Sequence, residues 1–370
     1  MNINDYKNQN CECGKPQRAK PRFLTHRVSE AEAGRSVQSL LRNEMQLSGG
    51  LAARLKRVEN GITLNGEKVF SNVRAAEGDI IAAAIGFCPE RCGKLPFEVL
   101  FEDEDLLIIN KPAGAAVHGS RYDDSVPSIE LAVNEYYGDE GFFHPVSRLD
   151  RGTTGVMTIA KNGYMHERLS ACLHTDSYVR FYIGICHGWL GANTGTVDMP
   201  IKREDGPSVR RVIDPCGAEA ITDFRLLKDY GFNGCRGFAA EENEQAENIV
   251  IKKENVTGTG NAPVPHICPA CGQETVIKKE NDAQRYENKS GLIPVEFRLR
   301  TGRTHQIRVH AAAVGHPLAG DWLYGTEEPE LIGRPALHSY RLEFVHPLRG
   351  EKLCIKAELP QDMQKLLSGR

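Results

Sequence analysis

The chain has 370 residues, enough for two domains with separate cores, and its 40% hydrophobic and 26% charged residues are typical of a soluble globular protein. No apolar run approaches the roughly 18–20 residues that a membrane helix needs, and the N-terminus has no apolar signal core, so we expect a cytoplasmic protein without membrane contacts. The formal net charge of −3 excludes a nucleic-acid binder that is basic throughout, so cations that bind nucleic acid must be gathered locally.

The N-terminal part of the chain is expected to hold a polar extension and then a small folded domain. Residues 1–33 show no sustained apolar period, so we expect them to be disordered or to lie on the surface. In residues 34–86, Ser36 and Ser48 can each cap a short helix, the Asn65-Gly pair predicts a hairpin, and GDIIAAAI adds a strand. This order resembles the small α/β RNA-binding domain of ribosomal protein S-four.

The second of these expected helices carries basic residues beside its apolar stripe. Arg54, Lys56 and Arg57 are suitably spaced to follow RNA phosphates, which is the role that the resemblance implies. A solvated helix face is the alternative interpretation.

A linker over residues 87–95 separates this domain from a larger one over 96–370. Short strand-like runs alternate there with the helix-like segment YMHERLSACL. An interval at about 232–290 is polar and contains the hexapeptide VIKKEN twice, at 250–255 and 276–281. A perfect short repeat in a polar tract indicates sequence expansion, so we expect an insertion without a packed element.

The segment RLDRGTTG places a carboxylate in a turn that leads into the apolar run VMTIA. Asp150 stands between Arg148 and Arg151, and Gly155 ends the turn. A loop at the start of a strand can present a nucleophile on a rigid support, and the neighbouring cations favour its ionised form. A structural turn with a surface ion pair is the alternative.

A second cluster lies in LRTGRTHQIRVHAAAVGHPLAGDWLYG. Thr304 can cap a helix that starts at His305, and Arg308 one turn later can pair with a carboxylate from elsewhere in the fold. His305, His310 and His316 also suggest a metal site, but the five-residue step from His305 to His310 is poor ligand spacing on one helix face.

The third cluster, YVRFYIGICHG, is a strand that contains Tyr182. A core tyrosine with a backbone partner for its hydroxyl is the simplest interpretation of this residue alone.

Together the three clusters resemble the motifs of RluA-type pseudouridine synthases, and weaker similarities fill the gaps in the same order over about residues 96–362. The resemblance implies an α+β fold with a mixed, largely antiparallel central sheet and flanking helices. It also implies that Asp150 is the nucleophile, that Tyr182 packs on the uracil and helps remove the proton from carbon 5, and that Arg308 pairs with the aspartate. Further residues expected to bind substrate are Arg148, Arg151, Arg303 and His305.

Such an enzyme isomerises uridine in structured RNA without a cofactor. Asp150 either adds to the anomeric carbon or removes the 2′-proton to form a glycal, and both routes stay open. Two residues depart from the family motifs. Ser147 stands where a histidine that helps extrude the base is usual, and Arg180 stands where a lysine is usual.

Large-subunit ribosomal RNA is the favoured substrate and transfer RNA the second, and we expect a monomer. The alternatives are a catalytically inactive scaffold for ribosome assembly and a metal-dependent RNA hydrolase. The eleven cysteines are expected to be thiols or metal ligands, not disulfides. Of these, Cys268 and Cys271 resemble half of a zinc ribbon, to which Cys88 and Cys92 can supply the other half.

Overall fold

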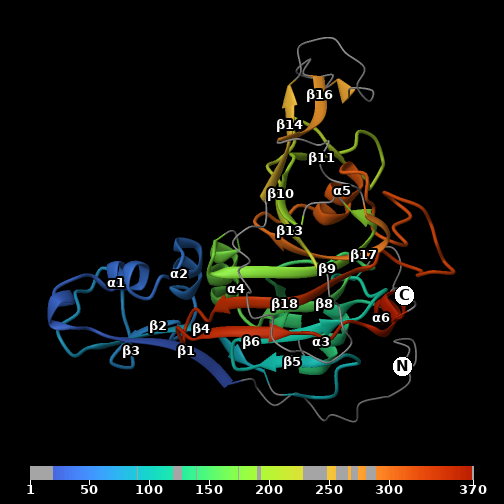
Figure 1. Ribbon diagram of the computed structural model, residues 1–370. Coiled ribbons are helices and arrows are strands. Elements are labelled where there is room, and N and C mark those ends of the chain that lie inside the picture. Colours follow the sequence, from blue (N-terminus) through green and yellow to red (C-terminus); the bar gives the residue numbers. More distant parts are fainter. Residues whose placement is uncertain are drawn as a thin grey trace. The chain divides into compact units, whose positions relative to one another are not determined.

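The structure, a computed structural model, describes residues 20–89, 91–119, 127–138, 140–173, 175–189, 193–227, 248–255, 266–267, 274–280 and 289–368. The chain forms two compact units (Figure 1). The first unit contains Met1–Asn110, Ala115–Arg148 and Met157–Ala171, and the second contains Lys111–Gly114, Leu149–Val156 and Cys172–Arg370.

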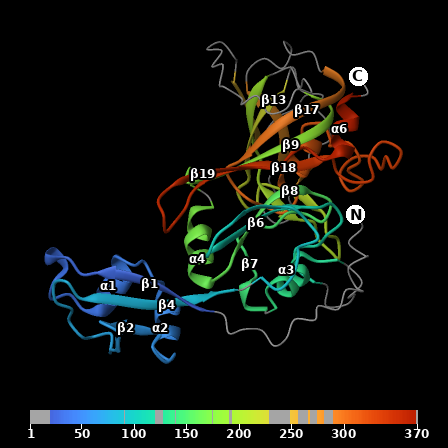
Figure 2. The same ribbon diagram turned by 90° about the horizontal axis from the view of Figure 1, so that it is seen from below.

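The first unit begins with a four-stranded sheet in the order β1-β4-β2-β3. Its strands are β1 (Lys20–Arg27), β2 (Ile62–Leu64), β3 (Glu67–Lys68) and β4 (Ile80–Cys88). The helices α1 (Val37–Asn43) and α2 (Gly49–Leu55) lie along one face of this sheet (Figure 1, Figure 2). Both predicted caps are present, because the Ser36 and Ser48 hydroxyls accept hydrogen bonds from the third backbone N–H that follows. The hairpin is also confirmed, with left-handed φ angles of 51° at Asn65 and 87° at Gly66.

The prediction that residues 1–33 form an extension is wrong from Lys20 onward. β1 pairs with β4 from Lys20 opposite Cys88 to Arg27 opposite Ile80. The half-buried positions of this edge strand include charged side chains, so backbone hydrogen bonds hold a strand whose sequence shows no apolar alternation. β4 also continues to Cys88, inside the predicted linker.

The rest of the first unit consists of short strands and two helices. They are β5 (Val99–Glu102), most of β6 (Leu106–Lys111), α3 (Ile129–Tyr137), β7 (His144–Pro145), the end of β8 (Thr154–Ala160), and α4 (Gly163–Cys172) with the helix-like segment predicted from the sequence. Every residue of β8 is buried, and so are five of the six residues of β6, which explains their continuous apolar character.

The second unit is built on a sheet in the order β15-β16-β14-β10-β13-β17-β9-β18. The listed strands are β9 (Tyr178–Trp189), β10 (Thr194–Asp198), β13 (Ile221–Leu226), β14 (Asn248–Asn255), β15 (His266–Ile267), β16 (Glu274–Glu280), β17 (Lys289–Leu299) and β18 (Leu337–Val345). β19 (Lys352–Lys356) pairs with β18, and β11 (Ile201–Arg203) forms a separate hairpin with β12 (Arg211–Ile213). Neighbouring strands in this order are antiparallel except for the pair β10 and β14, and the start of β8 (Thr154–Ala160) pairs with β18 in parallel. The expected α+β class with a mixed, largely antiparallel sheet is confirmed.

Two helices accompany this sheet, α5 (Gln306–Ala313) and α6 (Gln361–Ser368). Ile183 and Ile185 of β9 belong to an apolar cluster with Met363 and Leu366 of α6. Because side chains alternate along a strand, Tyr182 projects from the face of β9 opposite this cluster. The sheet therefore has the apolar cluster with α6 on one face and Tyr182 on the other.

The first VIKKEN copy lies in β14, and the described residues 276–280 of the second lie in β16, which contradicts the expectation of no packed element in this interval. The copies pair with each other in antiparallel register, from Val250 opposite Glu280 to Asn255 opposite Thr275. β14 in turn pairs with β10, and Ile251 is fully buried. The hexapeptide does not alternate apolar and polar residues, so its strand character rests on backbone pairing that the sequence pattern does not reveal.

Candidate active site

The Asp150 loop is fixed from behind by a buried lysine. Lys111, fully buried, donates hydrogen bonds from Nζ to the carbonyl oxygens of Pro112 at 3.0 Å, Arg151 at 3.2 Å and Thr153 at 2.9 Å. Inside the loop, the Thr153 N–H donates to the Asp150 carbonyl oxygen at 3.0 Å. These bonds hold the backbone from Asp150 to Thr153, and the side chain of Asp150 stays 27% exposed.

The residues after the loop join β18. Gly155 has a φ of 108°, and a Cβ there would lie 2.1 Å from the Ser339 carbonyl oxygen, so only glycine fits. One residue earlier, Thr154 makes a 2.8 Å hydrogen bond through its hydroxyl with Nδ1 of the buried His338. The loop that presents Asp150 is therefore anchored to the central sheet.

Arg308 of α5 lies between two carboxylates. Its Nε and Nη2 donate to Asp321 Oδ2 and Oδ1 at 2.8 and 2.7 Å, and its Nη1 lies 3.3 Å from Asp150 Oδ2. Burial acts to lower the pKa of Arg308, but the hydrogen bonds and negative charges of Asp321 and Asp150 outweigh it and raise the pKa. The guanidinium therefore stays charged, and Asp321 fixes its orientation toward Asp150.

Asp321 is the residue of this arrangement that the sequence interpretation missed. It is fully buried, and its Oδ1 also accepts the N–H groups of Leu323 and Tyr324 at 3.2 and 3.3 Å. The available signal was a second acidic residue within the motif that also supplies Arg308, in a turn opened by Gly320 with a φ of 68°.

His305 differs from its prediction. The helix begins at Gln306, and His305 is the N-cap residue in a left-handed conformation with a φ of 59°, so Thr304 does not occupy the cap position. The Gln306 side chain accepts from the Arg303 N–H at 2.9 Å instead. His305 Nδ1 lies 2.8 Å from the Tyr324 hydroxyl and its Nε2 lies 3.8 Å from Asp150 Oδ2. Burial lowers the pKa of His305, which favours its neutral form.

Tyr182 is buried in β9, opposite Phe297 of β17 and Ser339 of β18. Burial raises the pKa of its phenol, and the negative charge of Asp150 acts in the same direction. The phenol is therefore protonated at neutral pH and lies within electrostatic reach of Asp150.

A cavity of about 740 Å³ lies beside Asp150 and Arg308. Tyr182, Asp321 and Tyr324 are not among the residues that line it. Four of the predicted residues line it: Asp150, Arg151, His305 and Arg308. The rest of the lining consists of the ion pair of Arg334 with Asp362 and of apolar or small residues, Ala113, Gly114, Gly152, Val209, Trp322, Leu323, Gly333 and Pro335. The structure thus brings Asp150, Arg308, His305 and Arg151 together.

The other predicted binding residues lie elsewhere in the chain. Arg303 is exposed and donates from Nε to the Glu219 carbonyl oxygen at 2.9 Å. Arg54, Lys56 and Arg57 are exposed residues of the first unit, in α2 and the turn that follows. Arg148 belongs to the first unit as well.

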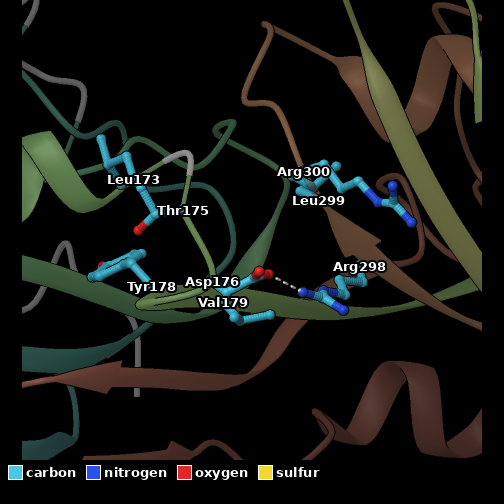
Figure 3. Close-up of a pocket in the computed structure, with 8 residues that line it drawn as sticks. All are labelled: Leu173, Thr175, Asp176, Tyr178, Val179, Arg298, Leu299 and Arg300. Atoms are coloured by element: carbon cyan, nitrogen blue, oxygen red, sulfur yellow. Dashed lines mark hydrogen bonds and ion pairs between the residues drawn. The ribbon is translucent and has the colours of Figure 1, made fainter.

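A second cavity of about 420 Å³ lies at the ends of β9 and β17 (Figure 3). Asp176 Oδ1 there is paired with Arg298 Nη2 at 2.7 Å, and Arg300 is paired with Asp223 outside the cavity lining. Both arginines at this cavity are thus neutralised by a carboxylate, whereas the cavity of Asp150 is lined by Arg151 as well as the shared Arg308.

Potential metal ligands do not gather within the described part of the chain, where no group of three or more histidine, cysteine or acidic side chains is suited to hold an ion. His310 is buried, with Nδ1 2.9 Å from the Thr222 hydroxyl and Nε2 2.9 Å from the Met199 carbonyl oxygen, so both ring nitrogens have protein partners. Cys88 and Cys92 take part in no disulfide among the described residues, and the zinc prediction for Cys268 and Cys271 falls outside those residues.

The chain matches a family model and curated relatives. A family model described as RNA pseudouridylate synthase matches residues 105–313. The uncharacterized RNA pseudouridine synthase YjbO of Bacillus subtilis is 31% identical over 88% of this chain and 96% of its own length. The ribosomal large subunit pseudouridine synthase D of Escherichia coli K12 is 27% identical, with 93% of each chain covered. Among solved structures, human RNA pseudouridylate synthase domain containing 4 has 20% identity and a TM-score of 0.45, covering 73% of this chain and 92% of its own.

Among the described helices, none combines the length and the apolar character needed to cross a bilayer.

Proposed function

Because the chain belongs to the RNA pseudouridylate synthase family and is an isomerase of RNA uridines, we propose that its substrate is large-subunit ribosomal RNA and that Asp150 is its nucleophile. The assignment of Asp150 as the nucleophile rests on the arrangement of Arg308 between Asp150 and the buried Asp321. The ribosomal RNA substrate is supported by the names of the relatives described as ribosomal large subunit pseudouridine synthase D.

The reaction breaks the bond between N1 of uracil and the ribose, rotates the base and forms a bond from carbon 5. Arg308 donates a hydrogen bond to Oδ2 of Asp150 and holds this carboxylate in the cavity lining, where it meets the ribose of an extruded uridine. Asp150 then either adds to the anomeric carbon or removes the 2′-proton. The proton leaves carbon 5 and N1 ends with a proton, so no redox equivalent or cofactor is required.

Tyr182 supports the base in this mechanism. Its raised pKa keeps the phenol protonated, so it acts as a packing surface and hydrogen-bonding group and does not serve as a free phenolate base. Neutral His305 lines the same cavity, and its hydrogen bond with Tyr324 holds the start of α5 in place.

The first unit is proposed to contribute RNA affinity. The two-helix, four-stranded arrangement of residues 20–88 supports the interpretation as an S-four-like RNA-binding domain, with Arg54, Lys56 and Arg57 contacting phosphates. We expect the enzyme to act as a cytoplasmic monomer.

Tritium release from RNA labelled at carbon 5 of uridine tests the proposal. Wild-type protein is expected to release tritium from unmodified large-subunit ribosomal RNA in excess chelator, and Asp150→Asn is expected to release none while it still binds RNA. Release only from transfer RNA would reassign the substrate. Activity retained by Asp150→Asn would remove the nucleophile assignment.

A further inference from the structure

The cavity that contains Asp150 has two large apolar side chains that the mechanism above does not use. Trp322 is 58% exposed and Val209 is 62% exposed, and both line this cavity. The tryptophan is the informative one, because an indole is a large apolar surface that proteins usually bury. Its exposure beside a reacting carboxylate suggests that a flat apolar group covers it in the complex.

Trp322 is carried by a rigid turn. The preceding residue, Asp321, is fixed by its two bonds to Arg308 and accepts the backbone N–H groups of Leu323 and Tyr324. The Asp321 carbonyl oxygen accepts the N–H of Gly325 at 2.7 Å. A partner that stacks on Trp322 therefore meets a backbone that is already ordered, which lowers the entropy cost of binding.

Arginines lie in the lining of this cavity and beside its neighbour Tyr324. Arg210, which is exposed, lies with its guanidinium carbon 5.7 Å from the ring centroid of Tyr324, and its neighbour Arg211 donates its backbone N–H to the Tyr324 hydroxyl at 2.8 Å. Arg151 lines the cavity itself. An aromatic platform with flanking arginines is the combination that binds unpaired nucleotides, through base stacking and phosphate contacts.

We infer that Trp322 is the stacking platform for the nucleobase next to the target uridine in the RNA strand, and that Val209 covers the edge of that base. The inference rests on the proposed function. Extrusion of the uridine removes a stacking partner from the adjacent base, and the indole replaces that partner at the mouth of the cavity. Trp322 thereby holds the strand in register with Asp150 and favours substrates whose neighbouring base is free to stack.

Steady-state tritium release from in-vitro-transcribed large-subunit ribosomal RNA tests this role. Trp322→Ala is expected to raise KM about 5- to 150-fold, the loss typical of one stacked base, with a smaller change in kcat. Trp322→Phe keeps an aromatic face and is expected to retain most of the affinity. The matched control is Leu331→Ala, which removes an exposed apolar side chain (39% exposed) that is not among the residues lining this cavity.

Tryptophan fluorescence gives a readout that does not depend on turnover. The chain has two tryptophans, so the RNA-induced quenching seen in wild type is expected to shrink in Trp322→Phe by the contribution of Trp322. An oligoribonucleotide with an abasic residue next to the mapped uridine is expected to bind wild type and Trp322→Ala equally. Tritium release with an unchanged KM for Trp322→Ala, or quenching that is as large in Trp322→Phe as in wild type, would overturn this inference alone. Absence of release from wild type would overturn the proposed function and this inference with it.

Discussion

At the scale of single residues, the charge balance of the cavity depends on Arg308. One guanidinium serves two carboxylates, with the shorter contacts of 2.7 and 2.8 Å to Asp321 and the longer one of 3.3 Å to Asp150. Asp321 is fully buried, whereas Asp150 is partly exposed. The stronger pair thus fixes the arginine, and the weaker one leaves Asp150 accessible to a substrate.

Because Asp321 holds Arg308 more closely than Asp150 does, replacing Asp321 is expected to lower the stability of the fold strongly. Asp321→Ala leaves the buried Arg308 without its bidentate partner, so the free energy of unfolding is expected to fall by about 3–5 kcal/mol, as measured by urea denaturation. Asp176→Ala is the matched control, because Asp176 also lies 2.7 Å from an arginine, Arg298, but its side chain is 95% exposed. Equal effects of the two substitutions would contradict the assigned role of burial.

The residues of the cavity differ in how far the sequence predicts them. Asp150 and Arg308 stand in motifs with a recognisable order, and their contact at 3.3 Å agrees with the predicted pairing. Asp321 was missed because its importance depends on where the chain returns after α5, which local spacing does not show. The cap at Thr304 was wrong because the left-handed His305 shifts the helix start by one residue.

At the scale of elements, local signals predicted α1, α2 and the Asn65-Gly hairpin well, because caps and turn residues act over three or four positions. β1 and the paired repeats of β14 and β16 were missed for the opposite reason. β1 pairs with β4, which is distant in the sequence, and the two repeat-bearing strands pair with each other. These strands also lack apolar alternation, so the local sequence does not reveal them.

The position of β14 yields a test. Ile251→Ala removes a fully buried side chain and is expected to cost about 2–5 kcal/mol, seen as faster hydrogen exchange in β10 and β14. Val250→Ala, at the neighbouring half-buried position, is the control and should have a smaller effect. If both substitutions leave exchange in β10 unchanged, β14 is an appendage and not part of the sheet that supports the cavity.

At the scale of the whole molecule, a net charge of −3 must be reconciled with a polyanionic substrate. The salt dependence of RNA affinity is set by the number of phosphates that the protein contacts and not by its net charge, so a local cluster of cations is sufficient for binding. Replacing Arg54, Lys56 and Arg57 by glutamine is therefore expected to reduce the slope of log affinity against log salt concentration by about 2–3, as measured by filter binding. A parallel shift at every salt concentration would instead indicate a loss of shape complementarity or folding.

Stability of the molecule should also depend on pH through two buried histidines that tie its sheet together. Burial lowers the pKa of His310 and of His338 to about 4, while their hydrogen bonds to Thr222 and Thr154 use the neutral ring as an acceptor. The unfolded chain binds these protons near pH 6.5, so stability is fully present above that pH, falls as the pH drops toward 4, and levels off below it. Each histidine is expected to contribute on the order of 3 kcal/mol to this loss.

The histidine contribution can be separated from that of titrating carboxylates by comparing slopes. His310→Gln is expected to unfold at lower urea concentration than wild type at pH 8, because it disturbs the bonds to Thr222 and Met199. Between pH 6.5 and 4, its free energy of unfolding should fall less steeply than that of wild type, since one group that binds a proton only in the unfolded state has been removed. A variant with the wild-type slope would show that His310 is protonated in the folded protein, and its hydrogen bond from Thr222 would then have to be reversed or broken.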